Sequence, residues 1–154
     1  MQGVFFVRTT REKTPIYYST EETFEVGGSK TLHQSGNDKA AIFAAGITLV
    51  EAMKAYDELK KEGIDVAIVD LYSVKPVDEK TINMMAEKTK NVIVVEDHYP
   101  YGGMGEAVKS VLKSNPNFIH LAVTKIPRSG TPEELLAYEE IDAAAIVKAV
   151  KSIK

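Results

Sequence analysis

Two carboxylates and a histidine follow an apolar run in the second half of the chain. Glu96, Asp97 and His98 come directly after residues 92–95. A carboxylate beside a histidine can carry out general acid–base catalysis. Consecutive residues of an extended segment point in opposite directions, however, so adjacency alone does not form a catalytic pair. The same side chains could instead cap the next helix or contact a second subunit, and the sequence leaves these alternatives open.

A glycine cluster, Gly102-Gly103-Met104-Gly105, comes next and precedes a helical pattern. It is not the dinucleotide fingerprint, which needs G-x-G-x-x-G after the first strand and an acidic residue further on. Free N–H groups at a helix start can bind an anion. The interpretation we favour is structural, because glycine also permits a tight turn and close packing of a helix on a sheet.

The other histidines give little support for a metal site. No second histidine lies at ligand spacing from His98, and we expect His33 and His120 to be structural. The chain has no cysteine, which excludes disulfides, thiolate catalysis and zinc–thiolate sites. From the residues alone we therefore assign no catalytic, cofactor-binding or metal-binding side chain.

Basic residues stand at two places where an anion could bind. Arg8 and Arg11 end an apolar segment, and an arginine at a strand end can hold a phosphate through two hydrogen bonds. Most such arginines are solvated or form ion pairs instead. Residues 125–131 place Lys125 and Arg128 before a capped helix, so this segment is either a second anion site or a surface loop.

Composition narrows the class of protein. The 154 residues carry a formal net charge of −3, and the sequence has no basic cluster, which argues against nucleic acid as the main partner. No apolar run approaches the roughly 20 residues that span a bilayer. The first residues lack the regions of a signal peptide, so a cytoplasmic location is the expectation.

From residue 40 onward, apolar runs alternate with amphipathic segments. Strands are predicted at 41–45, 64–71, 92–95 and 118–123, with helices between them and a last helix over 142–153. Runs that are apolar on both faces imply a parallel sheet covered on both sides. The fold class predicted is α/β: a three-layer α/β/α domain with a mostly parallel sheet and one antiparallel edge strand.

Several helix ends carry recognisable signals. Thr48 with Glu51, and Thr131 with Glu134, have the spacing of a capping box. Asp78 is placed to cap a helix over the next residues. We expect all three to be helix starts.

The first 39 residues differ from the rest. Residues 3–8 have the pattern of a short buried strand, and residues 9–39 show no sustained period. The turn signal at 35–38 predicts a hairpin between residues 30–34 and the strand that follows. The simplest division is 1–12 as the end of an upstream domain, 13–39 as a linker with an edge strand, and 40–154 as the main domain.

Three segments together resemble transketolase, the thiamine-diphosphate-dependent sugar transferase. Residues 3–11 (GVFFVRTTR) are similar to the end of its pyrimidine-binding domain. Residues 95–99 with 102–108 (VEDHY, GGMGEAV) are similar to the signature of its C-terminal domain, and residues 126–136 (IPRSGTPEELL) to a segment near its end. The match covers essentially the whole chain, as a C-terminal domain preceded by the last strand of the pyrimidine-binding domain.

The resemblance implies transfer of a two-carbon ketol unit between sugar phosphates in the pentose phosphate pathway, with the cofactor as electron sink. Thiamine diphosphate and a divalent metal, Mg or Ca, would be bound by upstream domains in cis or in trans, and the enzyme would be a homodimer. The resemblance assigns one substrate contact here, Arg11 to the sugar phosphate, whose oxygens match the guanidinium fork. Arg8 is a less favoured neighbour.

The resemblance also implies that this chain alone is inactive, because it has no thiamine-binding Gly-Asp-Gly motif. Two alternatives stay open. One is the equivalent domain of another thiamine enzyme, a deoxyxylulose-phosphate synthase or the beta subunit of a 2-oxo-acid dehydrogenase. The other is a stand-alone interaction or dimerisation module that has kept the fold without the chemistry.

Overall fold

A five-stranded sheet forms the centre of the computed structural model, which describes residues 2–10 and 13–154. The strands lie in the order β1-β3-β2-β4-β5. All neighbours run parallel except β1, which pairs antiparallel with β3 at one edge. The strands are β1 (Lys30–His33), β2 (Ala41–Ala44), β3 (Ala67–Asp70), β4 (Asn91–Val95) and β5 (Asn117–Leu121).

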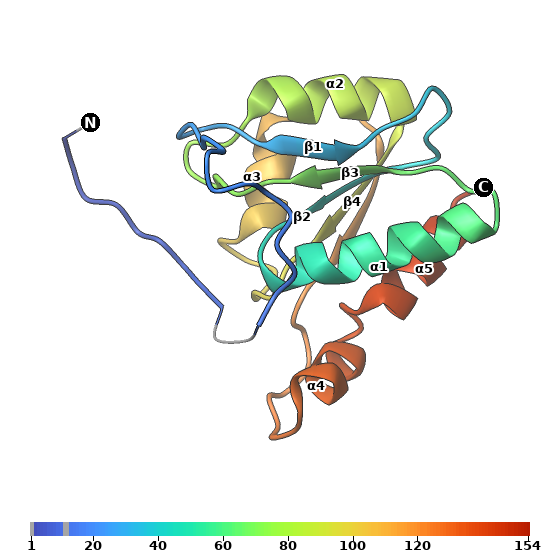
Figure 1. The fold of residues 1–154 in the computed structure, drawn as a ribbon. Helices are drawn as coiled ribbons and strands as arrows, with labels where there is room; N and C mark the ends of the chain where they lie inside the picture. The colour runs from blue at the N-terminus through green and yellow to red at the C-terminus, as the bar shows by residue number, and fades with distance from the viewer. Residues whose placement is uncertain (1, 11–12) are drawn as a thin grey trace.

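Helices cover both faces of this sheet, which confirms the predicted three-layer α/β/α fold (Figure 1). The helices are α1 (Ile47–Lys61), α2 (Glu79–Thr89), α3 (Met104–Val111), α4 (Pro132–Glu139) and α5 (Ala143–Ser152). α1 and α5 pack on one face, α2 and α3 on the other, and α4 lies beyond the end of the sheet. None of the helices in the described part of the chain is long and apolar enough to cross a membrane.

The central strand shows why the sheet needs two helical layers. Ile42 and Ala44 face the α1 and α5 layer, whereas Ala41 and Phe43 face the α2 and α3 layer. All four are fully buried. A strand buried on both faces has no polar side, as expected for a parallel sheet between helices.

Two of the three predicted helix starts are confirmed. Asp78 caps α2, since its carboxylate accepts a hydrogen bond from the backbone N–H of Thr81. Thr131 caps α4 as a complete capping box with Glu134, and Pro132 takes the first helical position, where its missing N–H does no harm.

The capping box predicted at Thr48 is wrong. α1 starts earlier, with Gly46 as its cap residue and no capping side chain. Thr48 lies inside the helix and donates its hydroxyl to the carbonyl of Val95, at 2.8 Å. Glu51 accepts from the backbone N–H of Ala143, at 3.0 Å, and so joins α1 to α5. The side chains of Thr48 and Glu51 therefore bond to residues distant in the sequence and do not form a capping box.

The predicted hairpin between residues 30–34 and the next strand is also wrong. β1 does not pair with β2, because β3 and β4 occupy the two hydrogen-bonding edges of β2. The turn itself exists: the carboxylate of Asp38 accepts from the backbone N–H of Ser35. After this turn the chain moves to the centre of the sheet, and β1 remains at the edge.

Residues 3–8, predicted as a strand left over from an upstream domain, pair with none of the described strands of this sheet. Residues 2–10, which we call the arm, form an extended segment without a paired strand (Figure 1). Val4, Phe6 and Val7 are largely exposed. None of the described strands pairs with the arm, so most of its apolar side chains stay exposed.

Candidate functional site

Glu96 stands at the carboxyl end of β4 and is almost fully buried. Its carboxylate accepts hydrogen bonds from the backbone N–H groups of Met104 and Gly105, at 2.6 and 2.9 Å. It also lies 2.6 Å from Nε2 of His120 on β5. The positive end of the α3 dipole favours a carboxylate here. Glu96 therefore caps α3, one of the alternatives that the sequence left open.

The glycines of the cluster make this arrangement possible. A Cβ atom at Gly103 would overlap the carboxylate of Glu96, and one at Gly105 would overlap the ring of His120. α3 can approach the ends of β4 and β5 only because these positions carry no side chain. The structural interpretation of the cluster is supported at both positions.

The neighbouring residues Asp97 and His98 do not form a catalytic pair. The ring nitrogen Nδ1 of His98 lies 2.6 Å from the carbonyl oxygen of Tyr99, and the side chain is exposed. Glu96 bonds to His120 and Asp97 turns to another partner. The carboxylate–histidine pair of this region thus joins residues 24 positions apart, on adjacent strands.

The partner of Asp97 is Arg8 in the arm. One guanidinium nitrogen donates to the backbone carbonyl of Asp97 at 2.7 Å, and the other to its carboxylate at 2.9 Å. The two side chains are 59% and 45% exposed, so this is a surface ion pair. It holds the arm at the carboxyl end of β4. Arg11, the predicted phosphate contact, lies outside the described residues.

A hollow of about 340 Å³ lies beside this contact, at the carboxyl ends of the strands. Its lining includes Thr9 and Thr10 of the arm, Gly46 before α1, and the pair Tyr18 and Asp70. The Tyr18 hydroxyl donates to the Asp70 carboxylate at 2.7 Å. Burial raises the pKa of Asp70, and the hydrogen bond from Tyr18 offsets part of this rise.

Sequence reasoning missed this second pair. A signal was available, because Asp70 is a carboxylate near the end of the apolar run 64–71, where parallel strands carry functional groups. Nothing in the local sequence pointed to Tyr18, which is 52 residues away. The two pairs hold Arg8 and Tyr18 at the carboxyl ends of the strands: Asp97 follows β4, and Asp70 ends β3.

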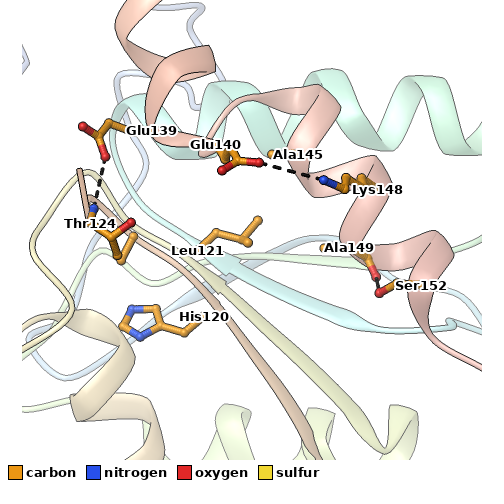
Figure 2. A pocket seen from close by; sticks show the side chains of 10 residues that line it. His120, Leu121, Thr124, Glu139, Glu140, Ala145, Lys148, Ala149 and Ser152 are labelled. Atoms are coloured by element: carbon orange, nitrogen blue, oxygen red, sulfur yellow. Dashed lines mark hydrogen bonds and ion pairs between the residues drawn. The ribbon is translucent and has the colours of Figure 1, made fainter. Parts of the chain in front are cut away.

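A second hollow, of about 310 Å³, lies between β5 and α5 (Figure 2). Glu139 lines it and accepts from the backbone N–H groups of Thr124 and Lys125, at 3.1 and 3.0 Å. Glu140 pairs with Lys125 at 3.0 Å and lies 3.9 Å from Lys148. Glu139 is thus bonded to the backbone, and Glu140 is flanked by two lysines.

The basic segment 125–131 also contacts its own chain. The guanidinium of Arg128 lies 3.8 Å from the ring centre of Tyr138, and the ammonium of Lys125 lies 5.0 Å from it. Thr131 is occupied in capping α4. These contacts support the interpretation as a surface loop rather than an anion site.

The remaining histidines have structural surroundings, as expected. His33 stacks on Tyr56 with ring centres 3.8 Å apart, and His120 contacts Glu96. Across residues 2–10 and 13–154, no group of three or more His, Cys, Asp or Glu side chains is placed to hold a metal ion.

Comparisons with known sequences all indicate the same family. Residues 29–146 match the family described as transketolase, C-terminal domain. Transketolase-like protein 1 of Bos taurus is 46% identical over 156 residues, covering 99% of this chain and 26% of that protein. Transketolase of Rattus norvegicus is 44% identical, covering 99% of this chain and 25% of that protein. The chain therefore spans about a quarter of the length of these relatives.

The solved structures that resemble this chain include transketolases as well. A split-gene transketolase, described as an inactive beta4 tetramer, superimposes with a TM-score of 0.81 at 30% identity. The overlap covers 90% of this chain and 45% of that one. Transketolase from Campylobacter jejuni gives a TM-score of 0.61 at 17% identity, over 82% of this chain and 18% of that one. The second likeness shows the fold alone.

Proposed function

This chain belongs to the transketolase family as its C-terminal domain, and we propose that it works within an enzyme that transfers a two-carbon ketol unit between sugar phosphates. The observation that carries the proposal is 44–46% identity to transketolase and transketolase-like proteins across nearly the whole chain. In this proposal the domain contributes structure and dimer contacts, and the enzyme acts in the pentose phosphate pathway of the cytoplasm.

The proposal assigns the cofactor to other domains. Thiamine diphosphate is bound through a divalent cation, Mg or Ca, and supplies the electron sink for the ketol unit. The described residues of this chain do not fit that group: they offer no three-ligand cluster for the cation, and Arg8, Lys125 and Arg128 are already paired. We therefore derive no chemical step in this domain.

The binding sites for thiamine diphosphate and its cation would be supplied by upstream domains, either in the same polypeptide or as a separate subunit. The likeness to a split-gene transketolase supports the second arrangement as well as the first. The proposal keeps the division of the chain into 1–12, 13–39 and 40–154, with the first part completing a sheet of the pyrimidine-binding domain. The exposed apolar side chains of the arm support this role, since they need a partner surface.

Arg11 is the one residue of this chain to which the proposal gives a substrate contact, with the phosphate of the sugar. In the complete enzyme, Arg11→Ala is expected to weaken use of a phosphorylated acceptor by about 1.5–3 kcal/mol, the scale of a charged hydrogen bond. An unphosphorylated aldehyde acceptor should be affected much less. The ratio of kcat/KM for the two acceptors measures this difference, and equal losses would point to a structural role.

A coupled assay for ketol transfer tests the proposed function directly. The complete protein, or this chain with its partner subunit, should turn over ketose and aldose phosphates with added thiamine diphosphate and Mg²⁺. This chain purified alone should not. Intact mass of the native polypeptide from source cells decides which form to assay. Ketol transfer by the isolated chain, or none by the assembled protein, would contradict the proposal.

A further inference from the structure

We propose that the loops at the carboxyl ends of β3, β4 and β5 form the surface on which the upstream domain of the complete enzyme docks. These loops are residues 71–78, 96–103 and 122–131, and we call them the rim. The inference rests on the proposed function, which places this chain in a larger enzyme, and it adds where the two parts meet.

Exposed apolar side chains gather at the rim. Val74 follows β3, Tyr99 and Tyr101 follow β4, and Ile126 follows β5. The other exposed large apolar side chains of residues 2–10 and 13–154 lie within the first 29 residues, except for Met84 on α2. Each of the three rim loops therefore offers at least one apolar side chain to solvent.

The loops at the opposite end of the sheet differ from the rim. Residues 34–40, 62–66 and 112–116 precede β2, β3 and β5, and none of their large apolar side chains is exposed. They carry charged side chains instead, among them Lys39, Glu62, Asp65 and Lys113. Exposed apolar side chains that are confined to one end of a domain mark an interaction site.

Most charged side chains of the rim are already engaged within the chain. Asp78 and Glu96 cap α2 and α3, and Asp97 is paired with Arg8. Lys125 pairs with a carboxylate at the end of α4. The centre of a protein interface is typically poor in charge and rich in tyrosine. A partner can thus cover the rim without burying these charges unpaired.

The two tyrosines belong to a loop that is ordered before any partner binds. The carbonyl of His98 accepts from the backbone N–H of Val123 at 2.9 Å, and the N–H of Gly102 donates to the carboxylate of Glu106 at 2.7 Å. The tyrosine rings lie 5.2 Å apart and are 58% and 66% exposed. A surface that is ordered in advance costs less entropy to bind, and tyrosine often dominates binding energy.

The arm indicates which partner occupies the rim. Arg8 holds the arm at Asp97, two residues before Tyr99, so the arm and the tyrosines adjoin. Figure 1 shows the arm on the side of the sheet toward which β3 points. Phe6 and Val7 of the arm are exposed and need a partner surface as well. In the proposed function the upstream domain takes the arm, and it therefore meets the rim too.

Hydrogen exchange of the complete protein, or of this chain with its partner subunit, tests the docking surface. Backbone amides of residues 98–102 and 125–130 should exchange about tenfold more slowly there than in this chain alone, because a docked partner suppresses local opening. Amides of residues 62–66 and 113–115 should exchange at equal rates in both. Slowing of the second set alone, or of neither, would overturn the inference.

A pair of variants tests the side chains themselves in the complete protein. Tyr101→Asp should raise exchange at residues 125–130 about tenfold, because it places an unpaired charge in the interface. Met84→Asp is the matched control, since Met84 is 46% exposed but lies on α2 outside the rim. Equal exchange at 125–130 in both variants would overturn the inference. In this chain alone, both variants should unfold at the same urea concentration as the unaltered chain.

Two further outcomes separate this inference from its alternatives. If this chain alone dimerises and exchange at residues 98–102 slows as its concentration rises, a second copy covers the rim and the inference fails; sedimentation velocity measures the dimer. If the complete protein protects the rim but transfers no ketol unit, the proposed function fails and the docking surface stands. Ketol transfer with an unprotected rim would give the opposite result.

Discussion

Glu96 illustrates what one residue can and cannot reveal in a sequence. Its place after an apolar run indicated the carboxyl end of a strand, and capping of the next helix was one of the predicted roles. Its contact with His120 was not predictable from spacing, because it depends on β4 and β5 being neighbours. Once the register pairs Val94 with His120, alternation puts Glu96 on the same face of the sheet.

Gly105 should be difficult to replace, because its added side chain would meet the ring of His120. Gly105→Ala would place a Cβ atom against the His120 ring, and relief requires the ring to leave Glu96. We expect a loss of about 1–2 kcal/mol in the free energy of unfolding, since the cost of overpacking exceeds the gain in helix propensity. Urea unfolding followed by circular dichroism measures the change.

Gly36→Ala is the control for this prediction. An added Cβ at Gly36 meets no atom within 4 Å, and the residue is not in the left-handed region. The free energy of unfolding of Gly36→Ala should differ from that of the unaltered chain by less than about 0.5 kcal/mol. A Gly105→Ala variant as stable as Gly36→Ala would show that α3 can move away from β5 at little cost.

At the level of elements, two identical local signals had different outcomes. Thr131 and Glu134 form the capping box that their spacing predicts, at an exposed helix start where no other partner competes. Thr48 and Glu51 have the same spacing, but both are buried and take partners on β4 and α5. Local motifs predict structure reliably only where the tertiary fold leaves the side chains free.

The cap of α2 provides a pH-dependent prediction. Burial alone would raise the pKa of Asp78, but hydrogen bonds from Thr81 and Ser29 outweigh it and hold the pKa below its ordinary value of 3.8. The charged carboxylate therefore stabilises the fold above that pH, and this contribution is lost as the pH falls through the lowered pKa.

Asp78→Ala is accordingly expected to lower the free energy of unfolding by about 1–2 kcal/mol at pH 7, the range for loss of an N-cap. The difference from the unaltered chain should shrink as the pH is lowered below 3.8. Asp78→Asn, which keeps a cap oxygen, should lose less at pH 7. Urea unfolding at several pH values checks both points; a difference that grew toward acid would contradict the assigned sign.

At the level of the whole molecule, the layers and the antiparallel edge strand were predictable, but the partner of that strand was not. The alternation of apolar runs with amphipathic segments predicts a covered parallel sheet, because the central strands β2, β3 and β4 are apolar on both faces. The pairing of β1 with β3 and the unpaired arm depend on which edges remain free after the centre is assembled. A local pattern carries no record of that competition, so the hairpin between residues 30–34 and β2 was predicted wrongly.

The exposed arm leads to a prediction for the isolated chain. Val4, Phe6 and Val7 are largely exposed. Removing residues 2–7 leaves the ion pair between Arg8 and Asp97 in place. The free energy of unfolding should change by less than about 0.5 kcal/mol, whereas self-association at high concentration should fall, because an exposed apolar segment favours aggregation. Urea unfolding and light scattering measure the two effects. A clearly destabilised deletion variant would show that the arm packs on the domain.

The order of the strands also bears on how the protein is made. Synthesis proceeds from the N-terminus, so β1 leaves the ribosome first, but its partner β3 follows more than thirty residues later. β2 and β3 can pair as soon as α1 has formed, and β1 can then close that edge. β4 adds to the free edge of β2 and β5 to that of β4. After β3, therefore, the sheet can grow during translation without any strand having to insert between two others.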